Sequence, residues 1–398
     1  MYKFYSNLKN FFSLKKRTKV VVLSNFDFNA NILIEFLIEN SNYEIHHLCC
    51  HPFEFNNDLY EFHNNKCPLF KSSSLIKSRY FFYHNINKKS YKFILQNADI
   101  VVCSFFQHII QILDSGYLSE KTQIINIWHG FPIRNIGYLC DGEKNFTAKI
   151  LSYNRTENIH HVVPSKFYQD LFIKAFCTKE KFVYILGNIR SSIIKNTNNI
   201  ADTYLKKIHK NYKNYKIILF CPTHATRSND DIQYLPLFIY QDYNIKEFND
   251  FLYQNKILLL LKKHNGDTNN YDCNASNIIF LNKKSLKNAK IVIQNLFYYS
   301  DMLITDASSL YVDYLLCNKP ILITSTPDTY KFKLISDEVI KQDIITTQVQ
   351  LMQQIQSNII TQNKISAKQA EIRDLLCGNT EYNLVLPRLK KLLIKLKK

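Results

Sequence analysis

Residues Ile124 to Arg134 read Ile-Ile-Asn-Ile-Trp-His-Gly-Phe-Pro-Ile-Arg, an apolar run that stops at a histidine and a glycine. Such a run predicts a buried strand, and Gly130 permits a sharp turn at which a ligand can approach the backbone. His129 stands at that turn. Because imidazole titrates near neutral pH, it can take a proton from an attacking hydroxyl. His129 is therefore a candidate catalytic residue; the alternative is a loop histidine that caps a helix.

The same pattern, an apolar run that ends at polar residues, recurs along the chain. In the first half, apolar runs predict strands at 20–23, 43–50, 100–103, 124–128, 162–163 and 183–186. In the second half, they predict strands at 216–220, 257–261, 278–281, 302–305 and 321–324. Stretches with helical spacing separate them, which indicates α/β halves with parallel sheets and helices on both faces. Ligands bind outside the carboxyl ends of the strands in such sheets.

The length of 398 residues favours two domains. The polar, Asn/Lys-rich stretch 191–215 marks their boundary. We therefore expect a basic amphipathic segment at 1–18, an N-terminal Rossmann-like domain at 19–200, a C-terminal one at 201–375 and a basic helix at 376–398. With 46% hydrophobic residues, extensive disorder is excluded.

The formal net charge of +18 predicts an acidic partner. No zinc finger, RNA-binding signature or basic zipper is present, so we expect no nucleic acid. The 10 cysteines form no CxxC pair and are expected to be reduced. No apolar run is long enough to span a membrane, and the N-terminus lacks an apolar signal core with a small-residue cleavage site, so we expect a cytoplasmic protein. The basic amphipathic termini predict either peripheral contact with the anionic inner face of the membrane or helices docked on the enzyme.

Two more polar motifs follow predicted strands. Lys262-Lys263-His264 ends the strand at 257–261, and its cations suit a diphosphate whose charge grows as a bond breaks. Cys221-Pro222-Thr223 ends the strand at 216–220 and leads to Arg227, which can clamp a phosphate, as can Arg134 in the first motif. In each case the alternative is a solvated surface loop.

The last motif is Thr305-Asp306-Ala307-Ser308-Ser309, at the start of a predicted helix over 308–317. Free backbone N–H groups and the helix dipole favour an anion such as phosphate there. Ser308 or Ser309 can equally serve as an N-cap. Asp313, one helical turn further on, can accept a ribose hydroxyl or face solvent.

Together the four segments resemble the CDP-glycerol glycerophosphotransferase family, which includes teichoic-acid and capsule polymerases. Its members carry, in this order, a WHG-T-P-L-K, a P-T-x-R, a K-x-H-P and a T-D-Y-S-S segment. Here Phe131 and Arg134 replace the threonine and the lysine of the first segment, and two extra residues separate Thr223 from Arg227. Asn265 and Ala307 replace the later proline and tyrosine.

The resemblance implies a GT-B fold, with two Rossmann-like doubly wound domains facing a cleft. It implies a CDP-glycerol or CDP-ribitol donor, attack of an acceptor hydroxyl on the phosphorus distal to cytidine, and release of CMP. His129 would be the base, and His264 would stabilise the donor phosphates. The other donor-binding residues would be Arg134, Thr223, Arg227, Lys263, Thr305, Asp306, Ser308, Ser309, Asp313 and Asp328.

No cofactor is expected, and no DxD-like pair is placed for a metal, so Mg²⁺ would be non-essential. The acceptor would be a polyanionic polymer or a lipid-linked precursor. Two other functions stay open. One is a GT-B glycosyltransferase using a nucleotide sugar such as CMP-sialic acid, and the other is a non-catalytic protein that binds polyanions during polymer assembly.

Overall fold

The computed structural model describes residues 17–24, 28–40, 42–49, 80–83, 88–133, 135–153, 156–194, 199–222, 237–238, 240–263, 275–289, 291–306, 308–324, 344–362, 364–378 and 381–397. The chain forms two compact units. The first contains Met1–Gly130, Gly137–Arg190 and Thr380–Lys398, and the second contains Phe131–Ile136 and Ser191–Asn379. Apart from the short excursion of 131–136, the chain changes unit at 190/191 and 379/380, against boundaries of 200/201 and 375/376 expected from the sequence.

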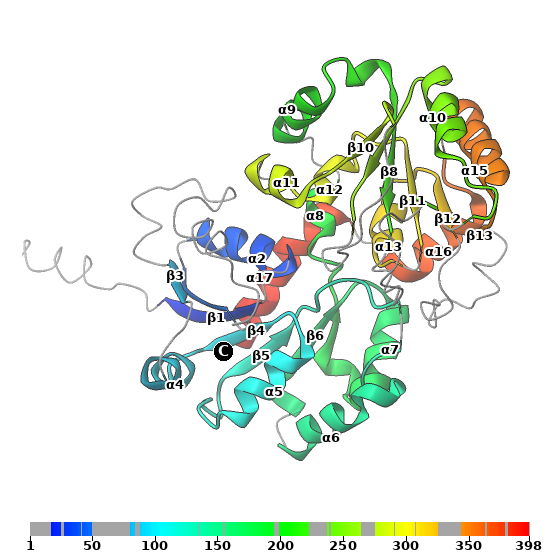
Figure 1. The fold of residues 1–398 in the computed structure, drawn as a ribbon. Helices are drawn as coiled ribbons and strands as arrows, with labels where there is room; N and C mark the ends of the chain where they lie inside the picture. Colours follow the sequence, from blue (N-terminus) through cyan, green and yellow to red (C-terminus); the bar gives the residue numbers. More distant parts are fainter. Residues whose placement is uncertain are drawn as a thin grey trace, which may run out of the picture. The chain divides into compact units, whose positions relative to one another are not determined.

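The first unit is built on a seven-stranded sheet in the order β3-β2-β1-β4-β5-β6-β7 (Figure 1). Its strands are β1 (Thr18–Ser24), β2 (Tyr43–Cys49), β3 (Tyr80–Tyr83), β4 (Ile100–Cys103), β5 (Gln123–Asn126), β6 (Ile159–Val163) and β7 (Val183–Ile185). Every pairing is parallel. All four residues of β4 and all five of β6 are buried, as expected for central strands covered by helices on both faces.

The helices of the first unit follow the strands along the chain. They are α2 (Phe28–Ile38), α4 (Lys88–Gln96), α5 (Phe106–Asp114), α6 (Lys144–Ser152), α7 (Lys166–Phe176) and, from the C-terminus, α17 (Val385–Leu396). Within α17, the apolar side chains of Val385, Leu389, Leu392 and Leu393 are buried in the protein. Packing therefore accounts for the amphipathic pattern of this helix, and the membrane-binding alternative for the C-terminus is not needed.

The second unit has a six-stranded parallel sheet in the order β10-β9-β8-β11-β12-β13. Its strands are β8 (Lys216–Cys221), β9 (Ile257–Leu261), β10 (Ile278–Phe280), β11 (Met302–Thr305), β12 (Ile321–Thr324) and β13 (Ile344–Ile345). Its helices are α8 (Ser191–Ile194), α9 (Asn199–Ile208), α10 (Ile245–Gln254), α11 (Lys283–Ala289), α12 (Ile293–Leu296), α13 (Leu310–Leu315), α15 (Gln348–Ile355) and α16 (Ala367–Cys377).

The two parallel α/β sheets confirm the fold class expected from the sequence. The edge strands β3 and β13 were not predicted, because they are short and lack an aliphatic run. The N-terminal segment up to residue 16 lies outside the described residues, so its membrane role stays a prediction. Across the described part of the chain, no helix is both long and apolar enough to cross a membrane.

Gly137 supplies a test of packing in the first unit. It opens a 3-10 helix (Gly137–Leu139) with φ of +57°, and a Cβ at this position would clash with the carbonyl oxygen of Ala175. Gly137→Ala therefore combines backbone strain with a clash against a backbone atom of α7. We expect it to lower the free energy of unfolding by about 3 kcal/mol or more, measured by urea denaturation.

The matched control is Gly142→Ala, because a Cβ at Gly142 meets no atom within 4 Å. This variant should unfold at close to the wild-type urea midpoint. Equal midpoints for the two variants would show that α7 moves aside without cost.

Candidate active site

The turn after β5 holds its shape through a left-handed residue. Trp128 has φ of +50°, a backbone conformation that residues other than glycine rarely adopt. Its N–H donates to Oδ1 of Asn126 at 3.0 Å, and its carbonyl accepts from Nδ2 of Asn29 at 2.6 Å. Asn126 is the last residue of β5 and Asn29 lies in the first turn of α2, so a strand and a helix fix the two peptide units that flank Trp128.

The Trp128 ring is anchored on α7. It meets Phe172 edge-on at 5.5 Å between centroids and Phe176 at 5.8 Å. Behind it, the buried His161 of β6 stacks on Phe176 at 5.1 Å, and its Nδ1 lies 3.2 Å from Nδ2 of Asn126. The indole is thus part of the core, and it is the neighbouring imidazole that reaches the surface.

His129 is exposed and can meet a ligand, although protein rings flank its imidazole. The ring stacks on Phe105 with centroids 4.4 Å apart and an interplanar angle of 6°, and it lies 5.2 Å from the Trp128 ring. The loss of hydration among these rings, reinforced by the charge of Arg190, lowers the pKa of His129 to about 4, against a hydrogen bond to the Ser104 backbone that raises it. His129 is therefore neutral at pH 7 and able to accept a proton.

Arg190 completes this turn, although sequence motifs did not predict a role for it. It is buried, and its Nη2 donates to the carbonyl of His129 while its Nε lies 3.3 Å from Oδ1 of Asn29. A Cβ at position 130 would lie 3.0 Å from Nη2, so Gly130 leaves room for the guanidinium. The one nearby feature of the sequence that could have indicated a site here is Gly187 (φ of +100°). It follows the end of β7, as the other motifs follow the ends of their strands.

In the second unit, strand register brings three motifs to one edge. Cys221 at the end of β8 pairs with Thr305 at the end of β11. β9 ends at Leu261, and the N–H of the following Lys262 donates to the Phe220 carbonyl of β8 at 2.9 Å. Burial raises the pKa of the Cys221 thiol to about 12, and the charges of Lys262 and Asp306 act on it in opposite directions. Lysine and carboxylate thus flank the end of β8, and Lys263 follows directly.

The residues at the end of β11 that are predicted to bind the nucleotide donor differ in burial and in hydrogen bonding. Thr305 is fully buried and donates its hydroxyl to the Cys221 carbonyl at 2.7 Å, which joins two strands. Oγ of Ser308 accepts from the N–H of Leu310 at 3.3 Å. Ser309 is the N-cap of α13, yet its half-buried side chain makes no capping bond, so the capping alternative is wrong for its hydroxyl.

Asp313 lies inside α13 with none of its surface exposed. Its Oδ2 accepts from Nε2 of Gln294 of α12 at 3.4 Å. Burial, reinforced by the charge of Asp313, raises the pKa of the Cys377 thiol of α16. The expectation that Asp313 can face solvent is therefore wrong. A direct contact with ribose would require α13 to move.

The remaining predicted site residues lie outside the described residues: Arg134, Thr223, Arg227, His264 and Asp328. The pairing of His129 with a second histidine stays a prediction. Among the residues that are described, no group of three or more His, Cys, Asp or Glu side chains is placed to hold a metal ion. The described groups support proton transfer at His129 and binding of an anion near Lys262, Lys263 and Ser309.

The sequence profile of the family described as CDP-Glycerol:Poly(glycerophosphate) glycerophosphotransferase matches residues 18–382. The chain belongs to this family. It is a transferase of the glycerophosphotransferase type, as the four motifs predicted. No curated protein matches the chain significantly.

Solved structures of the wall teichoic acid polymerase TagF share the fold. A histidine-to-alanine variant of TagF gives a TM-score of 0.68 at 16% identity, covering 96% of this chain and 90% of that one. TagF without this substitution gives 0.65 at 17% identity, with coverage of 96% and 90%. The UDP-GlcNAc 2-epimerase from Neisseria meningitidis bound to UDP-GlcNAc gives 0.58 at 10% identity, with coverage of 95% and 100%. The predicted GT-B fold with two Rossmann-like units is confirmed.

Arg190 can be tested through the titration of its neighbour. Arg190→Gln removes a positive charge beside His129, so the pKa of His129 should rise from about 4 towards its ordinary value of 6.5. Arg190→Lys keeps the charge and loses the forked donors, so the pKa should stay low. NMR titration of the His129 ring checks both variants, and an unchanged pKa in Arg190→Gln would contradict the electrostatic coupling.

His161 behind the turn should make the first unit sensitive to acid. Burial, reinforced by the neighbouring His160, lowers the pKa of His161 to about 3 from 6.5. The unfolded chain therefore takes up a proton that the folded state refuses, and stability falls as the pH drops from about 6.5 to about 3, by about 1.4 kcal/mol per pH unit. His161→Gln should flatten the pH dependence of the urea midpoint by that slope.

The control for this experiment is Phe172→Leu, which weakens the same core without removing a titrating group. It should lower stability at every pH and leave the slope unchanged. An unaltered slope in His161→Gln would mean that the ring is protonated in the folded state.

Proposed function

We propose that the protein transfers a polyol phosphate, glycerol phosphate or ribitol phosphate, from a CDP-activated donor to an acceptor hydroxyl, with release of CMP. The family supports a transferase of this type. The observation that carries the proposal is His129, a neutral imidazole held by a strained turn at the carboxyl end of β5. A related structure also bears on the donor, because a TagF histidine-to-asparagine variant was studied with CDPG after a 15-minute soak.

In the proposed reaction, His129 takes the proton of the acceptor hydroxyl as its oxygen attacks the phosphorus distal to cytidine. The bond from that phosphorus to the bridging oxygen breaks, and CMP leaves. A pKa of about 4 ensures the unprotonated ring at pH 7 but makes it a weak base. The negative charge of a bound donor and acceptor would raise this pKa and strengthen the base when it is needed.

The second unit would hold the donor. Lys263, Ser308, Ser309 and Asp306 follow neighbouring strand ends, which is where nucleotides bind in open α/β sheets. His264, Arg134, Thr223, Arg227 and Asp328 would complete the donor site, with His264 on the donor phosphates. Phosphoryl transfer requires mainly positioning and charge neutralisation, and the lysines at this edge would supply charge without an essential Mg²⁺.

The product would be a polyanion of the teichoic-acid or capsule type. The net charge of +18 supports such a partner, because long-range attraction raises the local concentration of an anionic chain. The acceptor would be that chain or its lipid-linked precursor, reached from the cytoplasmic face of the membrane. The N-terminal segment 1–18 would contribute to membrane contact.

The proposal is tested by measuring nucleotide release from CDP-glycerol, CDP-ribitol, CMP-sialic acid and UDP-sugars with a short polyol-phosphate acceptor. We expect CMP release from a CDP-polyol, with or without excess chelator. His129→Asn should lower kcat by about 10²- to 10⁴-fold, because proton transfer from the acceptor is lost. The acid limb of kcat/KM should lie near pH 4, and that of kcat should lie higher because the anionic donor raises the pKa.

The control is His46→Gln, a histidine of β2 that bonds Glu44 and Tyr83 away from the turn. It should retain near wild-type rates. Release of CMP from CMP-sialic acid alone, or of UDP from a sugar donor, would replace the proposal with a glycosyltransferase. Normal polymer binding by His129→Asn with no turnover of any donor by the wild type would favour a non-catalytic binding protein.

A further inference from the structure

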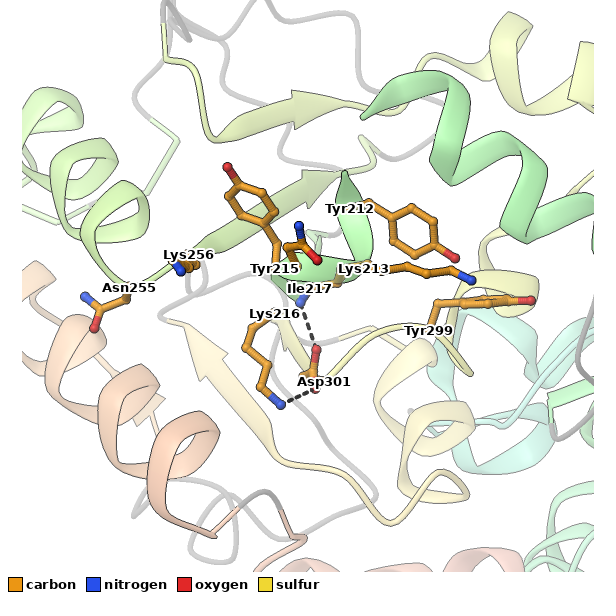
Figure 2. Close-up of a pocket in the computed structure, with 10 residues that line it drawn as sticks. Tyr212, Lys213, Tyr215, Lys216, Ile217, Asn255, Lys256, Tyr299 and Asp301 are labelled. Carbon is orange, nitrogen blue, oxygen red and sulfur yellow. Dashed lines mark hydrogen bonds and ion pairs between the residues drawn. The ribbon is translucent and has the colours of Figure 1, made fainter. Parts of the chain in front are cut away.

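A recess in the second unit lies at the opposite end of the sheet from the donor motifs. Its walls come from the segment before β8, the end of α10 and the segment before β11 (Figure 2). Its accessible volume is about 560 Å³, within the range of about 300–1,000 Å³ usual for small-molecule sites. It is lined by Tyr212, Lys213, Asn214, Tyr215, Lys216, Ile217, Asn255, Lys256, Tyr299 and Asp301.

The position of the recess separates it from nucleotide chemistry. Strands β8, β9 and β11 begin at the recess and end at the donor motifs. Because β8 has six residues, the two ends lie about 20 Å apart. Nucleotides bind at the carboxyl ends of such strands, so the amino end calls for another ligand.

Positive charge is concentrated at this recess. Lys213 pairs with Asp202 at 3.4 Å, but Asp202 also binds Lys206 at 2.6 Å. Lys216 pairs with Asp301 at 3.1 Å, and Asp301 also accepts the N–H of Ile217 at 2.8 Å. The carboxylates are therefore shared, and an excess of lysine charge faces the opening.

Lys256 adds a cation on the other side. It follows α10 in a left-handed conformation with φ of +52°, and its carbonyl accepts the N–H of Lys216 at 2.9 Å. This bond ties the turn to the start of β8. Figure 2 shows Lys256 and Asn255 on one side of the recess, and Lys213 with Tyr212 and Tyr299 on the other.

Tyrosines form much of the remaining wall. The rings of Tyr212 and Tyr299 meet edge-on at 6.5 Å, and Tyr215 meets His209 edge-on at 4.7 Å. The Tyr212 hydroxyl donates to Asp202, which holds its ring in place. Rigid rings offer flat faces for C–H groups, and their hydroxyls can bond to polyol oxygens.

We propose that this recess binds a segment of an anionic polyol-phosphate chain at a distance from its reacting end. The inference rests on the proposed function for the identity of the chain. Lysines on two sides suit phosphodiesters, and the tyrosine faces and amides suit the polyol between them. A membrane is a poorer fit, because the one aliphatic residue of the lining, Ile217, is buried and cannot insert into lipid.

Such a site makes chain length matter. An acceptor that spans less than about 20 Å from the donor edge cannot reach the recess and gains nothing from it. A longer chain is held at a second point, and its reacting end then stays at high effective concentration. The recess would therefore favour extension of chains that are already long.

The test uses the full-length protein with the double variant Lys213→Gln/Lys256→Asn. Glutamine removes the charge of Lys213 but keeps an unbranched, polar side chain, and asparagine tolerates the left-handed backbone at position 256. The matched control is Lys246→Gln/Lys364→Gln, two exposed lysines of the same unit that do not line the recess. The probe is fluorescent poly(glycerol phosphate), titrated at several salt concentrations.

We expect the recess variant to bind the chain about three- to tenfold more weakly than the wild type. The slope of log Kd against log salt should fall by about one to two, because fewer counterions are released. The KM for long acceptors should rise by a similar factor, while the KM and kcat for a single-unit acceptor stay unchanged. The control pair should match the wild type throughout.

Equal affinity and salt slope for the recess variant and the control pair would overturn the proposal. Loss of binding to anionic phospholipid vesicles with unchanged polymer affinity would also overturn it and assign the recess to the membrane. If the wild type turns over no CDP-polyol, the proposed function fails; the binding titration then still decides whether the recess holds the chain.

Discussion

The left-handed backbone of Trp128 is the constraint on which the site of the first unit depends. A non-glycine residue in this conformation costs about 1–3 kcal/mol and persists only where its surroundings enforce it. Here the conformation is held by hydrogen bonds on both sides of the Trp128 Cα, from its N–H to Asn126 and from Asn29 to its carbonyl. As a result, the indole packs on α7, while the imidazole of His129, 5.2 Å from the indole, stays accessible against Phe105.

The same constraint explains the electrostatics of His129. Arg190 grips the backbone of the turn through the His129 carbonyl, and in doing so it places a permanent positive charge beside the ring. Arg190 therefore shapes the turn and, after burial, is the second cause that lowers the pKa of the imidazole. Substituting it by lysine separates these effects, since lysine has charge but lacks the rigid fork. A bound anion would offset the arginine charge, so the basicity of His129 is tied to the presence of substrate.

The sequence predicted features that depend on neighbouring residues, and it missed features that depend on contacts between distant segments. Aliphatic runs such as Ile257–Leu261 located the central strands because strands covered on both faces must be apolar throughout. The motifs at the strand ends could be recognised because they begin where these apolar runs stop. Arg190 was missed because its partners lie 61 and 161 residues away, and nothing in its neighbours announces them. Asp313 was placed by helical spacing alone, which cannot tell whether Gln294 and α16 cover it.

The two ends of the second sheet differ for a reason built into the fold. In strand-helix units the helices run antiparallel to the strands. The negative ends of the helix dipoles, at the helix C-termini, therefore lie towards the amino ends of the strands. Lysines are stabilised there, and Lys206 and Lys207 occupy the last turn of α9 accordingly. Lys213 and Lys216, however, follow that helix in a 3-10 turn and at the first residue of β8, where the macrodipole has faded. Their charge is thus in excess of what the helix requires, and a polyanion is the partner that such an excess, set among tyrosines, would select.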